Sequence, residues 1–498
     1  MRTTVPLERV GWLIENVLSG PHHRRDVALN SHWNIRARVG LALLDFSVWI
    51  RRQRLLRMVY RVLPQKLRDL VSAGLAEPAL KGLHFPPLPT DVGAVGADLT
   101  RAATVAPVLA TRLTTTGVNI FGYLRGQFGL GESARMYARA LLAAGYPVAL
   151  IDIDIDLPHG LRDASLEGYI GTEAPYATNL IFVNPDYLRQ AWASIGQARL
   201  EGRYTIACWF WELEGIPDGW RWAIDAVDEI MVASTFVEEA FRRVTDKPIL
   251  RVRLPISDGV DSGVSRRDFG LSPDEFLFLT TFDFHSSIHR KNPFAAVAAF
   301  RKAFPLGRDD VRLLVKSSNG HQYPEQLHHL LSIAVEDPRI VVRDQMLERA
   351  HMHALQRCAD AYISLHRAEG FGLGLAECMA MGKPVIGTGW SGNLDFMTPR
   401  NSCLVEYTLV PVEPGEYPHS EGTRWAEADV DHAAAYMMRL VDEPAFASRV
   451  GKQAAMDIRH TLCPQRAARV LIERLSQLAS RPSIQNPRAA NGQNKAAP

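Results

Sequence analysis

Two glutamates eight positions apart, Glu369 and Glu377, are the pair of side chains in this chain whose spacing best suits chemistry. Glu369 opens a glycine-punctuated loop after an apolar run at 361–365, and Glu377 lies about one turn into a segment with helical character. A second apolar run follows at 385–387. This order predicts a strand, a loop, a helix and a strand, a unit that presents carboxylates and bare backbone amides where an anionic ligand docks.

Cations at the ends of two other predicted strands suit the neutralisation of a diphosphate. Arg290 and Lys291 stand just before Asn292 and Pro293, which we expect to be the N-cap and first residue of a helix. Lysine acts in such a place as a point charge and arginine as a planar fork. Lys316 closes another apolar run and is a weaker candidate of the same kind. Solvated surface cations are common, so that alternative stays open for all three.

A glycine-rich turn at 122–131 follows a predicted strand and opens a predicted helix, which is the context of a phosphate-binding loop. Gly126, Gly129 and Gly131 allow close approach to the backbone, and the helix N-terminus adds partial positive charge. The glycine spacing is not GxGxxG, and no acid stands on the second strand in the dinucleotide arrangement. A nicotinamide-dependent oxidoreductase is therefore a weaker alternative, and a tight turn without a ligand is another.

Together these features resemble the retaining glycosyltransferases of family 4, which have the GT-B fold. The resemblance covers about residues 117–480 and is most specific at 361–396, where the Glu-x7-Glu signature is intact. It implies that Glu369 contacts the donor sugar, that Glu377 binds the nucleotide ribose and that Lys291 neutralises the leaving diphosphate. It also implies that backbone amides of the intervening loop meet the sugar and the phosphate, namely those of Phe371, Gly372 and Leu373.

The chain departs from the family pattern at two places. The family's arginine lies five residues before its lysine, and Ser286 stands there in this chain, so Arg290 is the candidate substitute. The segment 391–395 replaces a Gly-Gly-x-x-Glu-like turn. The resemblance further implies front-face attack assisted by the leaving phosphate. The resemblance also implies that no metal is required. It implies no cofactor either, because the nucleotide sugar is a substrate.

An Asp-x-Asp run has two competing interpretations. Asp152, Asp154 and Asp156 alternate along a predicted strand and therefore share one face. Such a run is the metal-binding signature of another large glycosyltransferase fold. We interpret it here as a strand edge that enters the cleft, because the chain shows no other sign of that metal-dependent fold.

A tryptophan-rich segment follows another predicted strand on the expected acceptor side. Trp209 and Trp211 have rings that could stack on sugars, and Glu212 has a carboxylate that could bind hydroxyls. Packing of the tryptophans in the core is the competing interpretation, because buried tryptophan is common.

The composition excludes several classes of protein. A net charge of +2 gives no general case for binding nucleic acid, and no apolar run approaches the ~20 residues of a membrane span. The five cysteines are dispersed without metal-type spacing, which indicates reduced thiols in a cytosol-like compartment. The N-terminus lacks the pattern of a secretory signal. We therefore expect a cytoplasmic protein, with peripheral attachment to the inner face of a membrane as a candidate property.

Residues 1–116 are predicted to form a helical basic leader and a linker. Between residues 33 and 68, arginines and lysines are interleaved with apolar side chains and opposed only by Asp45. A basic amphipathic helix of this kind suits an anionic membrane surface. The alternative is a helical extension packed on the main body with a solvated basic face. The part at 84–116 has the composition of a linker.

The remaining chain alternates predicted strands and helices, which indicates an α/β protein with two Rossmann-like, doubly wound parallel-sheet domains facing a cleft. We expect an N-terminal acceptor domain at 117–260 and a C-terminal nucleotide-sugar donor domain at 261–462. A C-terminal helix at 463–480 and a disordered tail at 481–498 complete the prediction.

The predicted activity is retaining transfer of a hexose from a GDP- or UDP-sugar to an acceptor hydroxyl. By analogy with the family, the acceptor is a saccharide or a lipid-linked molecule, and the product is a cell-surface polysaccharide or glycolipid. The main alternative is a catalytically silent GT-B protein that binds a nucleotide sugar without turning it over.

Overall fold

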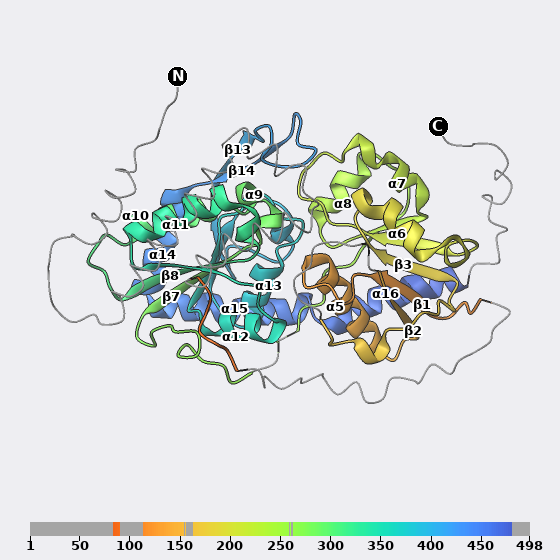
Figure 1. Ribbon diagram of the computed structural model, residues 1–498, viewed down its shortest axis with the longest axis horizontal. Helices are drawn as coiled ribbons and strands as arrows, with labels where there is room; N and C mark the ends of the chain where they lie inside the picture. Colours follow the sequence, from red (N-terminus) through yellow and green to blue (C-terminus); the bar gives the residue numbers. More distant parts are fainter. Residues whose placement is uncertain are drawn as a thin grey trace, which may run out of the picture.

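The computed structural model describes two α/β lobes that lie side by side (Figure 1). The described residues are 83–89, 113–153, 155, 163–257, 259 and 262–480. The predicted basic helix at 33–68, Asp154, Asp156 and the predicted tail at 481–498 lie outside these residues. None of the helices in the described part of the chain combines the length and apolarity that a membrane crossing requires.

The N-terminal lobe contains a six-stranded sheet in the order β2-β1-β3-β4-β5-β6, in which every neighbouring pair is parallel. The strands are β1 (Val118–Gly122), β2 (Val148–Asp152), β3 (Thr178–Phe182), β4 (Tyr204–Cys208), β5 (Glu229–Val232) and β6 (Ile249–Arg251). All residues of β1 and β3 are buried, as expected for central parallel strands covered on both faces. The helices of this lobe are α5 (Gly129–Ala143), α6 (Leu188–Ile195), α7 (Arg221–Ala226), α8 (Thr235–Arg242) and α16 (Pro464–Ala479).

The C-terminal lobe contains a second six-stranded parallel sheet in the order β12-β11-β10-β7-β8-β9. Its strands are β7 (Phe276–Thr281), β8 (Val311–Ser317), β9 (Ile340–Asp344), β10 (Ala361–Ser364), β11 (Val385–Thr388) and β12 (Cys403–Val405). Its helices are α9 (Ile288–Lys291), α10 (Pro293–Ala303), α11 (Pro324–Glu336), α12 (Arg349–Cys358), α13 (Leu373–Ala380), α14 (Val430–Asp442) and α15 (Pro444–Thr461). The two sheets confirm the predicted fold class.

The start of α10 follows the cap predicted from the sequence. Asn292 adopts a left-handed conformation, and its side-chain oxygen accepts a hydrogen bond from the backbone N–H of Ala295. Pro293 is the first helical residue, where its missing N–H costs no hydrogen bond. Behind this cap, Val297 and Phe300 pack in the core of the lobe. The short helix α9, which carries the two cations, is therefore fixed at its C-terminal end.

The strand order of each sheet indicates the edge at which a ligand is expected to bind. In the N-terminal sheet the order reverses between β1 and β3, and in the C-terminal sheet it reverses between β7 and β10. Ligands of open α/β sheets bind outside the carboxyl ends of the strands at such switch points. The glycine-rich turn follows β1, the Arg290–Lys291 segment follows β7 and the Glu369 loop follows β10. All three predicted site segments therefore start at switch points.

Two segments that the sequence analysis placed outside both predicted domains pack on the lobes. Residues 83–89, predicted as linker, pack on the C-terminal lobe, where the Leu83 carbonyl accepts from the N–H of Asp344 and Phe85 is buried against Phe269. The helix α16 returns to the N-terminal lobe and packs along α5, as Figure 1 shows. Its Arg474 pairs with Glu229 of β5 at 2.7 Å. The N-terminal lobe therefore includes the end of the described chain.

An antiparallel hairpin that the sequence did not reveal projects from the C-terminal lobe toward the N-terminal lobe (Figure 1). Its strands are β13 (Tyr407–Pro411) and β14 (Arg424–Ala428). The loop 412–423 joins them and carries Tyr417, whose hydroxyl donates to Glu212 of the N-terminal lobe at 2.6 Å. The hairpin therefore links the two lobes beside the cavity described below.

Candidate active site

A cavity of about 670 Å³ lies between the lobes and is lined by residues of both. Gly129 and Glu212 line it from the N-terminal lobe, and Arg290, Lys291 and Glu369 line it from the C-terminal lobe. Its size is within the range of about 300 to 1,000 Å³ that is usual for small-molecule sites. The structure therefore brings together the predicted glycine turn, the cation pair and the first signature glutamate.

Arg290 and Lys291 converge on the carboxylate of Glu369. The Nη1 atom of Arg290 lies 3.3 Å from Oε2 of Glu369, and the Nζ atom of Lys291 contacts Oε1. Arg290 is 4% exposed and is held further by the carbonyl oxygens of Ala368 and Ser286, which accept from Nη1 and Nε. Although neighbouring residues of a helix point in different directions, each cation reaches a different oxygen of the same carboxylate.

The charges of this centre determine the protonation of each group. Burial alone would raise the pKa of Glu369, but Lys291 and Arg290 outweigh burial and lower it to about 2. Burial lowers the pKa of Lys291 below its ordinary value despite the neighbouring Glu369. Burial also works against charge on Arg290, but Glu212 and Glu369 outweigh it and raise its pKa. At neutral pH the centre therefore contains an ionised carboxylate beside a permanent cation and a lysine whose charge depends on its surroundings.

The backbone of the Glu369 loop is held by the segment that departs from the family turn. The N–H of Glu369 donates to Oγ of Ser391 at 2.8 Å, and the N–H of Gly392 donates to the Glu369 carbonyl at 2.9 Å. A Cβ atom on Gly392 would lie 2.3 Å from the carbonyl oxygen of Gly370, so only glycine fits there. Segment 391–395 therefore positions Glu369 through its backbone.

The loop residues that follow Glu369 lead into the N-terminus of α13. Gly372 is the N-cap with a φ of 96°, a conformation that favours glycine. Phe371, Gly372 and Leu373 all line the cavity, and the Phe371 ring packs on that of Phe396 at 5.1 Å. The free amides of a helix N-terminus suit an anionic group.

Glu377 and Lys316 line a smaller cavity of about 280 Å³ that shares Lys291, Gly129 and other wall residues with the first. The Oε2 atom of Glu377 accepts from Nε2 of Gln356 at 2.9 Å, and Oε1 contacts the guanidinium of Arg349. Burial raises the pKa of Glu377, but Arg349 and His353 outweigh it and lower the pKa to about 2. Lys316 is buried at the end of β8, and burial lowers its pKa.

The glycines of the first turn have different tasks. Gly129 is exposed at the start of α5 and lines both cavities. Gly131, unlike Gly129, lines neither of these two cavities, and its role in donor binding stays a prediction. A Cβ atom there would lie 2.5 Å from the carbonyl oxygens of Gly126 and Tyr123, so glycine is needed for the close packing of the turn.

The tryptophans predicted on the acceptor side lie in the core. Trp209 is fully buried and its Nε1 donates to the Val183 carbonyl. Trp211 is 4% exposed, its Nε1 donates to the Gly215 carbonyl, and its ring packs on Trp220 at 4.7 Å. Their ring faces are therefore not available to a sugar, and the structure favours the core-packing interpretation over stacking.

Side chains of the intervening positions face the cavity instead. Phe210 and Glu212 both line it. Alternate residues of an extended chain point to opposite sides, so 209 and 211 enter the core while 210 and 212 face outward. The Oε1 atom of Glu212 lies 3.7 Å from Nη2 of Arg290, and its Oε2 accepts from Tyr417. Glu212 thus brings a carboxylate of the N-terminal lobe to the cation centre.

Asp152, the described member of the Asp-x-Asp run, has an internal partner. Its Oδ1 accepts from the N–H of Arg125, and its Oδ2 lies 3.0 Å from Nη1 of the same residue. Within the described ranges, no group of three or more His, Cys, Asp or Glu side chains is arranged to hold a metal ion.

Three residues of the site escaped the sequence analysis. Arg349 and Glu132 form an ion pair at 3.3 Å in the wall of the smaller cavity, and Tyr417 reaches the larger one from the hairpin. The pair formed by Glu132 and Arg135 has the i, i+3 spacing of a helical ion pair and was visible in the sequence. The contacts of Arg349 and Tyr417 join residues far apart in the chain and had no local signal.

Comparison with known proteins gives one family and one fold. Residues 283–412 match the family model described as glycosyl transferases group 1. No curated protein matches the chain. Among solved structures, HepE of Anabaena in complex with UDP and glucose has a TM-score of 0.51 and 16% identity, covering 73% of this chain and all of its own. Sucrose-phosphate synthase of Thermosynechococcus elongatus has a TM-score of 0.53 and 16% identity, covering 73% of this chain and 99% of its own. A Rickettsia africae glycosyltransferase has a TM-score of 0.51 and 12% identity, covering 74% of this chain and all of its own.

Proposed function

We propose that this chain transfers a hexose from a GDP- or UDP-sugar to an acceptor hydroxyl, because residues 283–412 match the family model described as glycosyl transferases group 1 and because the chain has the GT-B fold. The transfer proceeds with retention at the anomeric carbon. The observation that carries this proposal is the convergence of Arg290 and Lys291 on Glu369 in a cavity between the lobes.

The cation centre suits the departure of a nucleoside diphosphate. Negative charge grows on the phosphate oxygen as its bond to the anomeric carbon breaks. Fixed charges placed where this charge develops lower the barrier without reorganisation of water. Lys291 and Arg290 supply them, and the amides at the start of α13 lie on the same cavity wall. In this arrangement the carboxylate of Glu369 binds hydroxyls of the donor sugar, and Glu377 binds the ribose.

The acceptor enters from the side of Glu212 and Tyr417. Its hydroxyl oxygen forms the new bond to the anomeric carbon on the face that the diphosphate leaves, and its proton passes to the departing phosphate oxygen. No covalent bond to the protein forms. Contacts across the lobes, such as the hydrogen bond from Ser234 to the Gly370 carbonyl at 2.6 Å, keep the cavity walled on both sides and limit access of water.

The proposed products are cell-surface polysaccharides or glycolipids made in the cytoplasm on a saccharide or lipid-linked acceptor. The basic segment at 33–68 is the proposed contact with an anionic membrane surface. Binding of the full chain to anionic vesicles should then weaken as salt rises and disappear when residues 1–80 are deleted. Equal binding to neutral vesicles would exclude this contact.

The activity is tested with the full chain, a panel of labelled UDP- and GDP-sugars and saccharide acceptors. HepE was solved with UDP-glucose, so a UDP-sugar is the first donor to test. Lys291→Ala should lower turnover by roughly a hundredfold or more, as expected for loss of a charge that stabilises the transition state. Lys452→Ala changes an exposed lysine of α15 and is the matched control, with unchanged turnover expected.

The alternatives predict different results in the same experiment. Stabilisation of the chain by NAD, but not by UDP or GDP, would favour the oxidoreductase alternative. Binding of a nucleotide sugar without release of sugar above the buffer background would favour a catalytically silent binding protein. Normal turnover by Lys291→Ala would remove the cation centre from the mechanism.

A further inference from the structure

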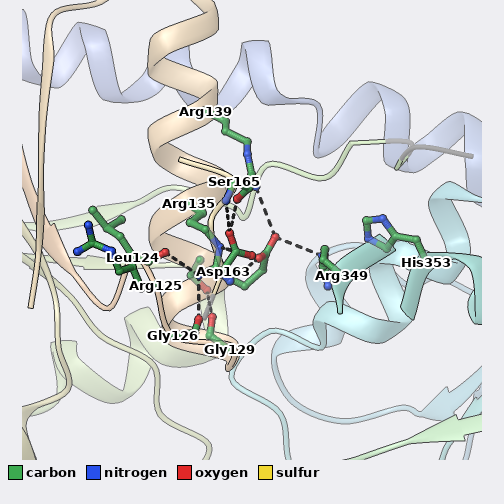
Figure 2. Close-up of polar contacts among 12 residues, drawn as sticks. Leu124, Arg125, Gly126, Gly129, Arg135, Arg139, Asp163, Ser165, Arg349 and His353 are labelled. Atoms are coloured by element: carbon green, nitrogen blue, oxygen red, sulfur yellow. Dashed lines mark hydrogen bonds and ion pairs between the residues drawn. The ribbon is translucent and has the colours of Figure 1, made fainter. Parts of the chain in front are cut away.

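A single arginine connects the second signature glutamate to the opposite lobe. Arg349 is the first residue of α12 in the C-terminal lobe, and its guanidinium contacts Oε1 of Glu377. Its Nε atom also lies 3.3 Å from Oε1 of Glu132, which is in the first turn of α5 in the N-terminal lobe. Figure 2 shows Arg349 of the C-terminal lobe facing the part of the N-terminal lobe that carries Arg135 and Asp163. We call Glu132, Arg349 and Glu377 the inter-lobe charge chain.

Glu132 is held rigidly at its end of this chain. Arg135 donates to its Oε2 from Nη2 at 2.7 Å and from Nε at 3.1 Å. The Nη1 atom of Arg135 in turn donates to the carbonyl oxygens of Leu124 and Gly126 in the glycine-rich turn (Figure 2). Glu132 is 7% exposed. Its carboxylate is therefore fixed to the turn that lines the cavity.

Glu377 retains hydrogen-bonding capacity at the other end. An ionised carboxylate can accept about four hydrogen bonds. Gln356 donates to Oε2, whereas Arg349 and His353 both lie at Oε1, so acceptor capacity remains chiefly on Oε2. All three members of the chain line the smaller cavity. A ribose hydroxyl can therefore donate to the carboxylate while Arg349 keeps its orientation.

We propose that Glu132 is a positioning residue for the nucleoside of the donor, because it holds Arg349 from the opposite lobe and so fixes the carboxylate of Glu377 that receives the ribose. This inference rests on the proposed function. It adds that nucleotide affinity depends on a residue of the acceptor lobe, which acts through Arg349.

The competing explanation is that the charge chain only joins the lobes. Another buried ion pair of the N-terminal lobe provides a comparison, because Glu229 is 1% exposed, pairs with Arg474 at 2.7 Å, and neither residue lines either cavity. Loss of a merely structural pair lowers thermal stability and leaves nucleotide affinity unchanged. Loss of a positioning pair changes affinity as well.

The test measures UDP and GDP binding by calorimetry, together with donor KM and kcat, in the full chain. Glu132→Gln removes the charge and keeps the shape of the side chain. We expect it to raise the nucleotide Kd and the donor KM roughly tenfold, equivalent to about 1.4 kcal/mol. We expect kcat to change by less than about twofold, because the residue does not act on the reacting atoms. Glu229→Gln should leave the Kd unchanged even where it lowers Tm.

Two further variants identify the route of the effect. In the Glu377→Gln background, Glu132→Gln should add less than about a twofold loss of affinity, because residues that act through one another are not additive. Arg349→Lys keeps the charge but loses the planar fork, and should give an intermediate Kd. This variant carries the same test if Glu132→Gln does not fold.

The outcomes separate this inference from the proposed function. An unchanged Kd in Glu132→Gln, or an equal rise in Glu229→Gln, would overturn the positioning role while the wild-type activity stands. Failure of the wild-type chain to bind UDP or GDP, or to turn over any donor, would overturn the proposed function and with it this inference.

Discussion

Replacement of Glu369 by glutamine separates binding of the diphosphate from transfer of the sugar. The change removes one negative charge and almost no volume. In the free protein Glu369 compensates both Arg290 and Lys291, and in the proposed complex the diphosphate takes over that compensation. We therefore expect Glu369→Gln to lose turnover but to retain, or gain, affinity for free UDP or GDP.

The structure sets the size of the effect. At an effective dielectric constant of about 20, opposite charges about 4 Å apart attract each other by about 4 kcal/mol. This gives the order of magnitude of the attraction that Arg290 and Lys291 each lose with the carboxylate. Because burial already lowers the pKa of Lys291, loss of Glu369 lowers it further and favours the neutral amine. In the donor complex the diphosphate restores the charge of the lysine, so the expected fall in kcat, by about a hundredfold to a thousandfold, comes from loss of the carboxylate that binds hydroxyls of the donor sugar.

The assay compares kcat and the Kd of UDP or GDP in the wild type and in Glu369→Gln, with Tm in the presence and absence of nucleotide. Breaking a buried pair by removing one partner costs about 3–5 kcal/mol, so the free variant should melt at a lower temperature. A saturating nucleotide should recover part of this loss, because its charges replace the missing carboxylate. A parallel loss of kcat and nucleotide affinity would refute the exchange of partners, and so would unchanged kcat.

Two further predictions concern the same cavity. Lys291 has a pKa below its ordinary 10.5, so kcat/KM should fall at alkaline pH as the lysine loses its proton. Lys291→Arg stays charged and should move this fall to higher pH. An unchanged pH profile in the variant would assign the fall to another group. Tyr417→Phe removes the hydrogen bond to Glu212 and should lower the free energy of unfolding by about 1 kcal/mol. The acceptor KM should rise several-fold while the donor Kd stays unchanged. A rise in the donor Kd alone would contradict an acceptor-side role.

The parts of the fold that the sequence predicted are those with local signals. The buried parallel strands read as short apolar runs, and the cap formed by Asn292 and Pro293 followed from residue types alone. The hairpin of β13 and β14 had no such signal, because its strands are separated by the long loop 412–423 rather than a tight turn. Hairpin prediction relies on a short connection, and this one has none.

The sequence predicted the site residues of single segments, but not the contacts between segments that are distant in the chain. Glu369, Glu377 and the cations could be placed at strand ends, but the sequence did not show that Arg290 and Lys291 share one carboxylate. The sequence left open whether Trp209 and Trp211 face a sugar or pack in the core, because the end of a strand does not reveal which alternate side chains enter the core. Contacts such as Tyr417 to Glu212, which lie 205 positions apart, depend on the packing of the two lobes.

The two signature glutamates share one arrangement that extends beyond the matched family segment. Each signature glutamate is linked through an arginine to a glutamate of the N-terminal lobe: Glu369 through Arg290 to Glu212, and Glu377 through Arg349 to Glu132.

Residues 283–412 contain both signature glutamates and both arginines, but neither glutamate of the N-terminal lobe. Each arginine therefore divides its attraction between two carboxylates only while the lobes are together. Separation of the lobes would leave each arginine to one signature glutamate, and would change the charge that the diphosphate and the ribose meet. The relative position of the lobes is thus part of the electrostatics of the site, and the signature segment alone does not determine how strongly the donor binds.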